Sequence, residues 1–158
     1  GDCVLQLRKV SESGEDVIVL CEGDPFFFGS FMHLHSRLMG ERRVEVVPAI
    51  TGMSAAWTAT GSPVTWGEDV LTVLMGTLPE EELERRISDT DALVVMKLGR
   101  NLTKVGRALQ MAGRADDAWL VECAAMPEQK IARWRDVEPD RVAPYFSIIV
   151  VHGRGRRP

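Results

Sequence analysis

The stretch VIVLCEGDPFFFGSF (residues 17–31) joins two patterns that together decide the fold class. The continuous apolar run 17–20 is typical of a strand that is buried on both faces. From Pro25 onward the apolar residues follow helical spacing, which predicts an amphipathic helix over 25–39. The residues at i, i+4, i+7 and i+11 are Phe27, Phe31, Leu34 and Leu38. Asp24 and Pro25 favour the N-cap and the first position of a helix, so a strand, an acidic loop and a helix are predicted in succession.

The same alternation continues along the chain. Further strands are predicted at 44–48, 70–76, 92–99, 118–124 and 145–153, and further helices at 3–13, 52–60, 79–89 and 101–113. The segment 130–137 alternates apolar and basic residues, which predicts an edge strand. Alternating strands and helices indicate an α/β fold with at least a partly parallel sheet. The segment 62–69 is polar and turn-rich, so we expect a linker there and two domains, 1–62 and 63–158.

The composition argues against several classes of protein. With 45% hydrophobic and 27% charged residues among 158, the chain has an ordinary globular composition. A net charge of -4 argues against general affinity for nucleic acid or for an anionic membrane. No apolar run approaches the length of a membrane span. The three cysteines (Cys3, Cys21 and Cys123) are widely spaced, which predicts neither a disulfide framework nor a metal site and fits a reducing cytoplasm.

The loop after the first predicted strand has the features of a ligand site. Ligands of open α/β sheets bind beyond the carboxyl ends of strands, and Gly23 allows a close approach to the backbone. Glu22 and Asp24 make this loop unsuited to phosphate, and the chain contains neither GxGxxG nor GxxxxGK[ST]. The loop therefore favours hydroxyl groups or a cation. The structural alternative is that Asp24 only caps the helix and the phenylalanines only pack.

Six stretches, read together, resemble the tetrapyrrole methylases of cobalamin biosynthesis. They are CEGDPFFFGSFMHLHSRL (21–38), VEVVPAITGMSAAW (44–57), DVLTVLMGTLPE (69–80), DALVVMKLGRNL (91–102), VECAAMPEQKI (121–131) and PYFSIIVV (144–151). The resemblance covers nearly the whole chain. It implies two α/β domains, the second with a mixed sheet and helices, with S-adenosylmethionine held in the cleft between them. It also implies a homodimer.

The resemblance assigns site residues by position. The expected contacts with the methyl donor are Gly23, Asp24, Phe27, Thr51, Gly52, Met96, Lys97, Ala124 and Pro144. The tetrapyrrole substrate carries many carboxylates, so Lys97 and Arg100 are also expected to bind it, with a purely structural role as the alternative for both. No residue is expected to act as a nucleophile, and no metal is expected.

Several features depart from the family pattern. Ala49 stands where the family usually has glycine, Gly52 where it has a small hydroxyl residue, and Cys123 where it has arginine. The family's first strand, with its glycine-rich loop, is not found in the sequence. We therefore interpret the chain as the back part of the first domain, truncated at its N-terminus, followed by the second domain. An exposed apolar sheet edge is expected in the first domain.

The function implied by the resemblance is S-adenosylmethionine-dependent methylation of precorrin-2 at C20. Methylation of the cobalt-containing counterpart, cobalt-factor II, is one alternative. A truncated, inactive fragment that only dimerises is another. A nucleotide-binding α/β domain is the third, and the lack of a phosphate loop weakens it.

Overall fold

The computed structural model describes residues 2–155, and the side chains from Val4 onward. The chain divides into two compact units, Gly1–Thr51 and Gly52–Pro158. The predicted domain boundary after residue 62 stays a prediction. Residues ahead of it, in helix α3 (Gly52–Ala59), contact two strands of the second unit. Each unit is described by itself below.

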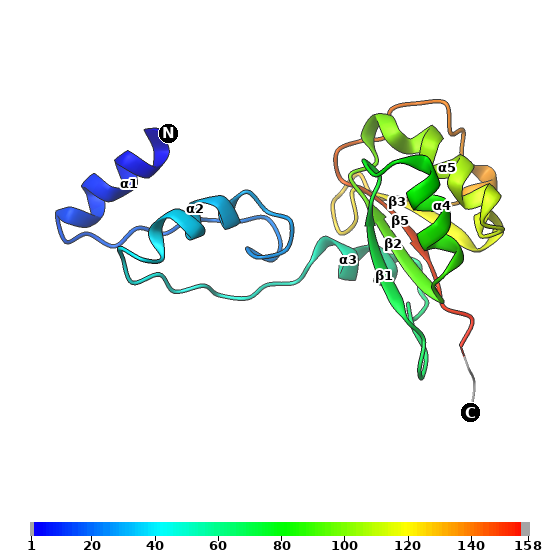
Figure 1. The fold of residues 1–158 in the computed structure, drawn as a ribbon, viewed down its shortest axis with the longest axis horizontal. Coiled ribbons are helices and arrows are strands. Elements are labelled where there is room, and N and C mark those ends of the chain that lie inside the picture. The colour runs from blue at the N-terminus through cyan, green and yellow to red at the C-terminus, as the bar shows by residue number, and fades with distance from the viewer. Residues whose placement is uncertain (1, 156–158) are drawn as a thin grey trace. The chain divides into compact units, whose positions relative to one another are not determined.

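A five-stranded mixed sheet forms the centre of the second unit (Figure 1). Its strands are β1 (Leu71–Met75), β2 (Ala92–Met96), β3 (Ala118–Glu122), β4 (Lys130–Arg133) and β5 (Ser147–Val151). They lie in the order β1-β2-β5-β3-β4. Strands β1 and β2 are parallel, and β5 and β4 are antiparallel to their neighbours. The predicted α/β class with a mixed sheet is therefore confirmed, and 130–133 is the predicted edge strand.

Two helices cover one face of this sheet, α4 (Glu80–Ser88) and α5 (Leu102–Met111) (Figure 1). Helix α4 begins after Pro79, carries three acids in its first turn, and buries Leu83 and Ile87. Helix α5 follows the 3-10 turn η1 (Gly99–Asn101), and the chain leaves the helical conformation at Gly113, which has a φ of 66°. The 3-10 turns η2 (Ala115–Asp117) and η3 (Trp134–Asp136) complete this layer. Its helical side chains form one buried cluster with those of the sheet.

Helix α3 covers part of the opposite face. Its Ala56 is fully buried against Val121 and Val150 of the sheet. At the end of β5, His152 lies 2.8 Å from the Pro63 carbonyl oxygen through Nδ1 and 2.9 Å from Thr60 Oγ1 through Nε2. These contacts hold the segment after α3 against the sheet.

The described residues of the first unit form two helices, α1 (Asp2–Glu12) and α2 (Phe31–Leu38). Arg8 of α1 donates two hydrogen bonds to Glu41, of 2.8 Å and 2.6 Å, which tie α1 to the segment after α2. The predicted helix over 3–13 is confirmed to within a residue at each end. The predicted helix over 25–39 is shorter than expected, because the chain from Pro25 to Ser30 forms turns instead.

The strands predicted at 17–20 and 44–48 are wrong for this structure. Neither run belongs to a sheet, and Ile18 and Leu20 are 84% and 91% exposed instead of buried. A strand is stabilised by hydrogen bonds to a neighbouring strand, and neither run has such a partner among the described residues. Apolar composition alone therefore did not produce a strand.

Candidate functional site

The carboxyl edge of the second unit's sheet gathers most of the predicted site residues of that unit. Strands β1, β2 and β3 run in one direction and end at Met75, Met96 and Glu122. The partner of Glu122 is Ser147, so the segment that leads into β5 reaches the same edge. The segments at this edge contain the predicted residues Met96, Lys97, Arg100, Ala124 and Pro144. Open α/β sheets bind their ligands at this edge.

The backbone at this edge is unusual. Lys97 follows β2 directly with a φ of 55°, and Cys123 follows β3 with a φ of 51°. Ala125, two residues further, has a φ of 62°. Left-handed conformations are costly for residues with a side chain and cluster at functional sites. Four non-glycine residues of the described chain have a positive φ. Three of them lie at this edge, and the fourth is Phe28 of the first unit.

Backbone hydrogen bonds tie the segments of the edge together. Gly76 N–H donates to the Met96 carbonyl at 2.7 Å, Cys123 N–H to Phe146 at 2.7 Å, and Ala143 N–H to Gly99 at 3.0 Å. A Cβ on Gly76 would lie only 3.0 Å from the Lys97 carbonyl oxygen. The position therefore favours glycine, because a side chain would crowd the loop after β1 against the end of β2.

The predicted side chains at the edge differ in exposure. Met96 and Ala124 are half-buried, whereas Lys97, Arg100 and Pro144 are exposed. Next to Pro144, the rings of Tyr145 and Phe146 form an edge-to-face pair with centroids 5.0 Å apart. Gly52, at the start of α3, is exposed, and a Cβ there would lie 3.7 Å from the Ile148 side chain near the start of β5. The edge thus offers cations, an apolar side chain and exposed aromatic rings.

In the first unit, Asp24 joins two loops. Its Oδ1 accepts a hydrogen bond from Phe26 N–H at 2.9 Å, and its Oδ2 accepts one from Ala49 N–H at 3.1 Å. The predicted N-cap role is therefore wrong, because α2 begins after Ser30. Asp24 instead holds the Gly23 loop to the segment that leads to Thr51. Gly23 has a φ of 78°, a conformation that favours glycine.

The phenylalanines of this loop pack against neighbouring rings. Phe27 and Phe28 form an edge-to-face pair at 4.9 Å, and Phe26 packs in the same way on His35 of α2 at 4.8 Å. Phe27, the predicted donor contact, is half-buried. Packing against neighbouring rings therefore accounts for much of the clustering of these phenylalanines.

The structure adds residues at the edge that the sequence did not single out. Gly76 is one, and the left-handed Ala125 is another. Glu122 is a third, because its buried carboxylate lies 2.8 Å from Arg141 Nη1. A left-handed alanine has no signal in residue type, and the Glu122–Arg141 contact joins residues far apart in the sequence.

The described residues contain neither a membrane-spanning helix nor a metal-binding cluster. No helix in the region 2–155 is long and apolar enough to cross a membrane. Within the same region, no cluster of three or more His, Cys, Asp or Glu side chains has an arrangement that could hold a metal ion.

Comparison with known families identifies the class to which this fold and edge belong. The model of the Tetrapyrrole (Corrin/Porphyrin) Methylases matches residues 2–136. The chain therefore belongs to the tetrapyrrole methylase family, which confirms the resemblance found in the sequence.

Individual relatives make the similarity more specific. The chain is 49% identical to a precorrin-2 C(20)-methyltransferase from Sinorhizobium sp. over 92% of its own length and 59% of the relative's. It is 29% identical to a cobalt-precorrin-2 C(20)-methyltransferase from Salmonella typhimurium, over 89% of the chain and 60% of that protein. The chain thus spans about three-fifths of the length of these two relatives.

A solved structure supports the same fold. The uroporphyrin-III C-methyl transferase from Thermus thermophilus, complexed with S-adenyl homocysteine, superposes with a TM-score of 0.72 at 22% identity. The match covers 96% of this chain and 72% of that one. At this level of identity the similarity establishes the shared fold.

Proposed function

We propose that the protein methylates precorrin-2 at C20 with S-adenosylmethionine as the methyl donor. The observation that carries the proposal is the 49% identity to a precorrin-2 C(20)-methyltransferase along 92% of the chain. Identity to the cobalt-precorrin-2 relative is 29%, which favours the metal-free substrate over cobalt-factor II.

The donor's chemistry fits the residues at the carboxyl edge of the second unit. S-adenosylmethionine carries a sulfonium cation and a ribose but no phosphate, so it needs no phosphate-binding loop. The edge presents backbone groups in left-handed turns, a half-buried methionine and exposed aromatic rings. Gly76 leaves the space that a Cβ would fill against the Lys97 carbonyl oxygen. In the second unit, the residues proposed to hold the donor are Gly52, Met96, Lys97, Ala124 and Pro144.

In the first unit, the residues proposed to contact the donor are Gly23, Asp24, Phe27 and Thr51. Both oxygens of Asp24 already accept backbone hydrogen bonds, so its part is to fix the Gly23 loop. Gly23 and Thr51 then lie on the two segments that Asp24 joins, and they are proposed to offer backbone contacts.

The substrate side of the proposal rests on two cations. Lys97 and Arg100 are exposed and follow β2 at the carboxyl edge. We assign them to the carboxylates of the tetrapyrrole, because charge-assisted contacts to carboxylates are strong and directional. When bound, the donor supplies an electrophilic methyl group to the ring carbon. The protein's part is to hold the two reactants in line, which requires no protein nucleophile.

Two further expectations belong to this proposal. The protein is proposed to act in the cytoplasm, as its cysteine usage predicts. It is also proposed to act as a homodimer, as the sequence resemblance implies. A fragment that dimerises without catalysis is the competing function, and donor binding separates the two.

The first test is calorimetric titration of the full chain with S-adenosylhomocysteine, the demethylated donor. We expect saturable binding at one site per chain, weakened about tenfold by Met96→Ala, because a half-buried apolar contact of roughly 1.4 kcal/mol is lost. Met111→Ala removes a methionine that is 70% exposed on α5 and serves as the matched control. No binding by a folded chain would contradict the proposal.

The substrate is tested in the same preparation. Turnover of precorrin-2 in preference to cobalt-factor II is expected, and the opposite preference would support the alternative substrate. Lys97→Ala should weaken tetrapyrrole binding while leaving the fold intact, since Lys97 is exposed.

A further inference from the structure

Glu122 is a buried carboxylate at the end of β3. The residue is 8% exposed. Glu122 and Ser147 are the two buried residues of the described chain that are polar or charged. Burial of a charge is costly unless a partner of opposite charge compensates for it. Two of the left-handed residues of the candidate site come next in the sequence, Cys123 directly after Glu122 and Ala125 two residues later. A charge in this position therefore calls for an explanation.

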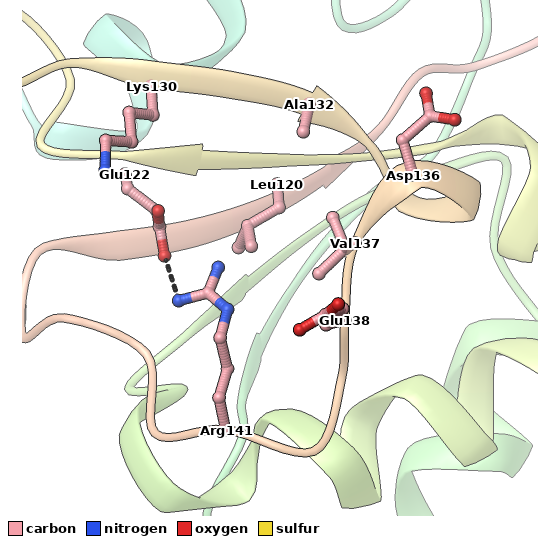
Figure 2. A pocket seen from close by; sticks show the side chains of 8 residues that line it. All are labelled: Leu120, Glu122, Lys130, Ala132, Asp136, Val137, Glu138 and Arg141. Carbon is pink, nitrogen blue, oxygen red and sulfur yellow. Dashed lines mark ion pairs between the residues drawn. The ribbon is translucent and has the colours of Figure 1, made fainter.

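Arg141 supplies the compensating charge. Its Nη1 lies 2.8 Å from Glu122 Oε1 (Figure 2). The arginine side chain is 38% exposed, and the glutamate side chain is 10% exposed. The contact has the distance of an ion pair but not the angles of a hydrogen bond, so among the described residues Oε1 has no aligned donor. The pair is therefore held by charge, and the carboxylate depends on Arg141.

Arg141 lies in a loop that is fixed on both sides of it. Before it, the Pro139 carbonyl accepts a hydrogen bond from Thr103 Oγ1 at 2.9 Å. After it, Ala143 N–H donates to the Gly99 carbonyl at 3.0 Å. The next residues are 144–146, which carry the exposed aromatic pair of the candidate site. Arg141 thus connects this loop to the end of β3.

We propose that Glu122 and Arg141 are a positioning pair for the candidate site. The ion pair holds the loop 139–146 against the end of β3 and so fixes the relative positions of Ala124 and Pro144, two proposed donor contacts. The effect on donor affinity rests on the proposed function. The effect on the loop rests on the geometry of the pair.

The surroundings of the pair make a chemical rescue possible. An open pocket of about 350 Å³ lies beside it, lined by Leu120, Glu122, Lys130, Ala132, Asp136, Val137, Glu138 and Arg141 (Figure 2). Figure 2 shows the Arg141 side chain reaching across this pocket to Glu122. In Arg141→Ala the guanidinium is removed beside an open space, so free guanidinium at millimolar concentration can reach Glu122.

The test compares amide hydrogen exchange in the wild-type chain of residues 1–158 and in its Arg141→Ala variant. Two amides report on the loop: Cys123 N–H, which donates to the Phe146 carbonyl, and Ala143 N–H, which donates to the Gly99 carbonyl. Their protection is expected to fall about tenfold, while the α5 amides keep theirs. Millimolar guanidinium should restore the protection, and Arg141→Lys should restore part of it. Arg135→Ala, which removes an exposed charge from η3, is the control. Unchanged protection at both amides would overturn the proposal.

Donor binding is measured on the same samples. If the wild type binds S-adenosylhomocysteine, Arg141→Ala should raise the Kd about tenfold and guanidinium should reverse this rise. If the wild type does not bind, the proposed function fails, while hydrogen exchange still decides the role of the pair. Should Arg141→Ala fail to fold, Glu122→Gln/Arg141→Ala removes both charges and must show the same loss of protection. Full protection in that double variant would also overturn the proposal.

Discussion

At Gly106, helix α5 has no room for a side chain. A Cβ there would overlap Cζ2 of Trp134, which is 5% exposed in η3. The indole therefore lies directly on the helix backbone, which brings the segment after β4 close to α5. Glycine is needed here because it has no side chain, and not because of its backbone angles.

Gly106→Ala is expected to lower the free energy of unfolding by about 1–2 kcal/mol. Overpacking costs about 1–3 kcal/mol, and the better helix propensity of alanine recovers up to about 1 kcal/mol. Urea unfolding measures the change. In a Trp134→Phe background the cost should shrink, because phenylalanine lacks the overlapping ring atoms. An equal cost in both backgrounds would show that the indole is not the cause.

Charged side chains of helix α4 interact with one another. Glu82 accepts hydrogen bonds from Arg85 at 3.0 Å and 2.9 Å, and from Arg86 at 2.5 Å. The hydrogen bond from Arg85, followed by that from Arg86, lowers the pKa of Glu82 from 4.5 to about 2. This arrangement follows from helical spacing, which brings residues three and four apart onto one face.

The lowered pKa of Glu82 gives α4 a pH dependence with a definite sign. Because the folded pKa lies below the usual 4.5, ionised Glu82 stabilises the folded state above pH 4.5, and this contribution disappears as the pH falls toward about 2. Glu82→Gln should therefore have a lower urea midpoint than the wild type at pH 7, with a difference that vanishes near pH 2.

Glu81→Gln is the control for charge, since it removes an acid from the same turn and leaves the Glu82 contacts in place. A wild-type advantage over Glu82→Gln that stays constant from pH 7 to pH 2 would contradict the assignment.

Over the whole molecule, the buried core belongs to one of the two units. Apart from Val4, every buried hydrophobic residue of the described chain lies in Gly52–Pro158. The first unit exposes large apolar side chains such as Ile18, Leu20 and Val47. Burial of apolar surface is the dominant favourable term in folding, so the stability of the chain should reside in the second unit.

Residues 52–158 expressed separately are expected to fold cooperatively, with a Tm within about 5 °C of that of the full chain, since 1 kcal/mol shifts the Tm of a domain of this size by roughly 4–8 °C. Residues 1–51 separately should show no cooperative transition. Calorimetry and circular dichroism measure both. Loss of cooperative unfolding in 52–158 would show that the first unit contributes to the core.

The regular elements of the second unit could be predicted because their signals are local. Helices α4 and α5 follow from apolar spacing and turn residues, and the buried strands follow from short apolar runs. The same reasoning failed at 44–48, and also at 17–20, where the apolar run is equally clear. The difference is not in the residues, because a strand also depends on hydrogen-bonding partners elsewhere in the chain.

The features of the candidate site also fall into two groups: those that local sequence predicts and those that depend on contacts between distant segments. The α/β class and the family could be inferred from the sequence alone, and the sequence also singled out candidate site residues after β2 and β3, since each of these depends on local pattern or on motif. The folded structure was needed to show that Asp24 bridges two loops, that Cys123 and Ala125 are left-handed, and that Glu122 pairs with Arg141. These features arise from contacts between distant segments and from backbone conformations imposed by packing, which residue type alone does not specify.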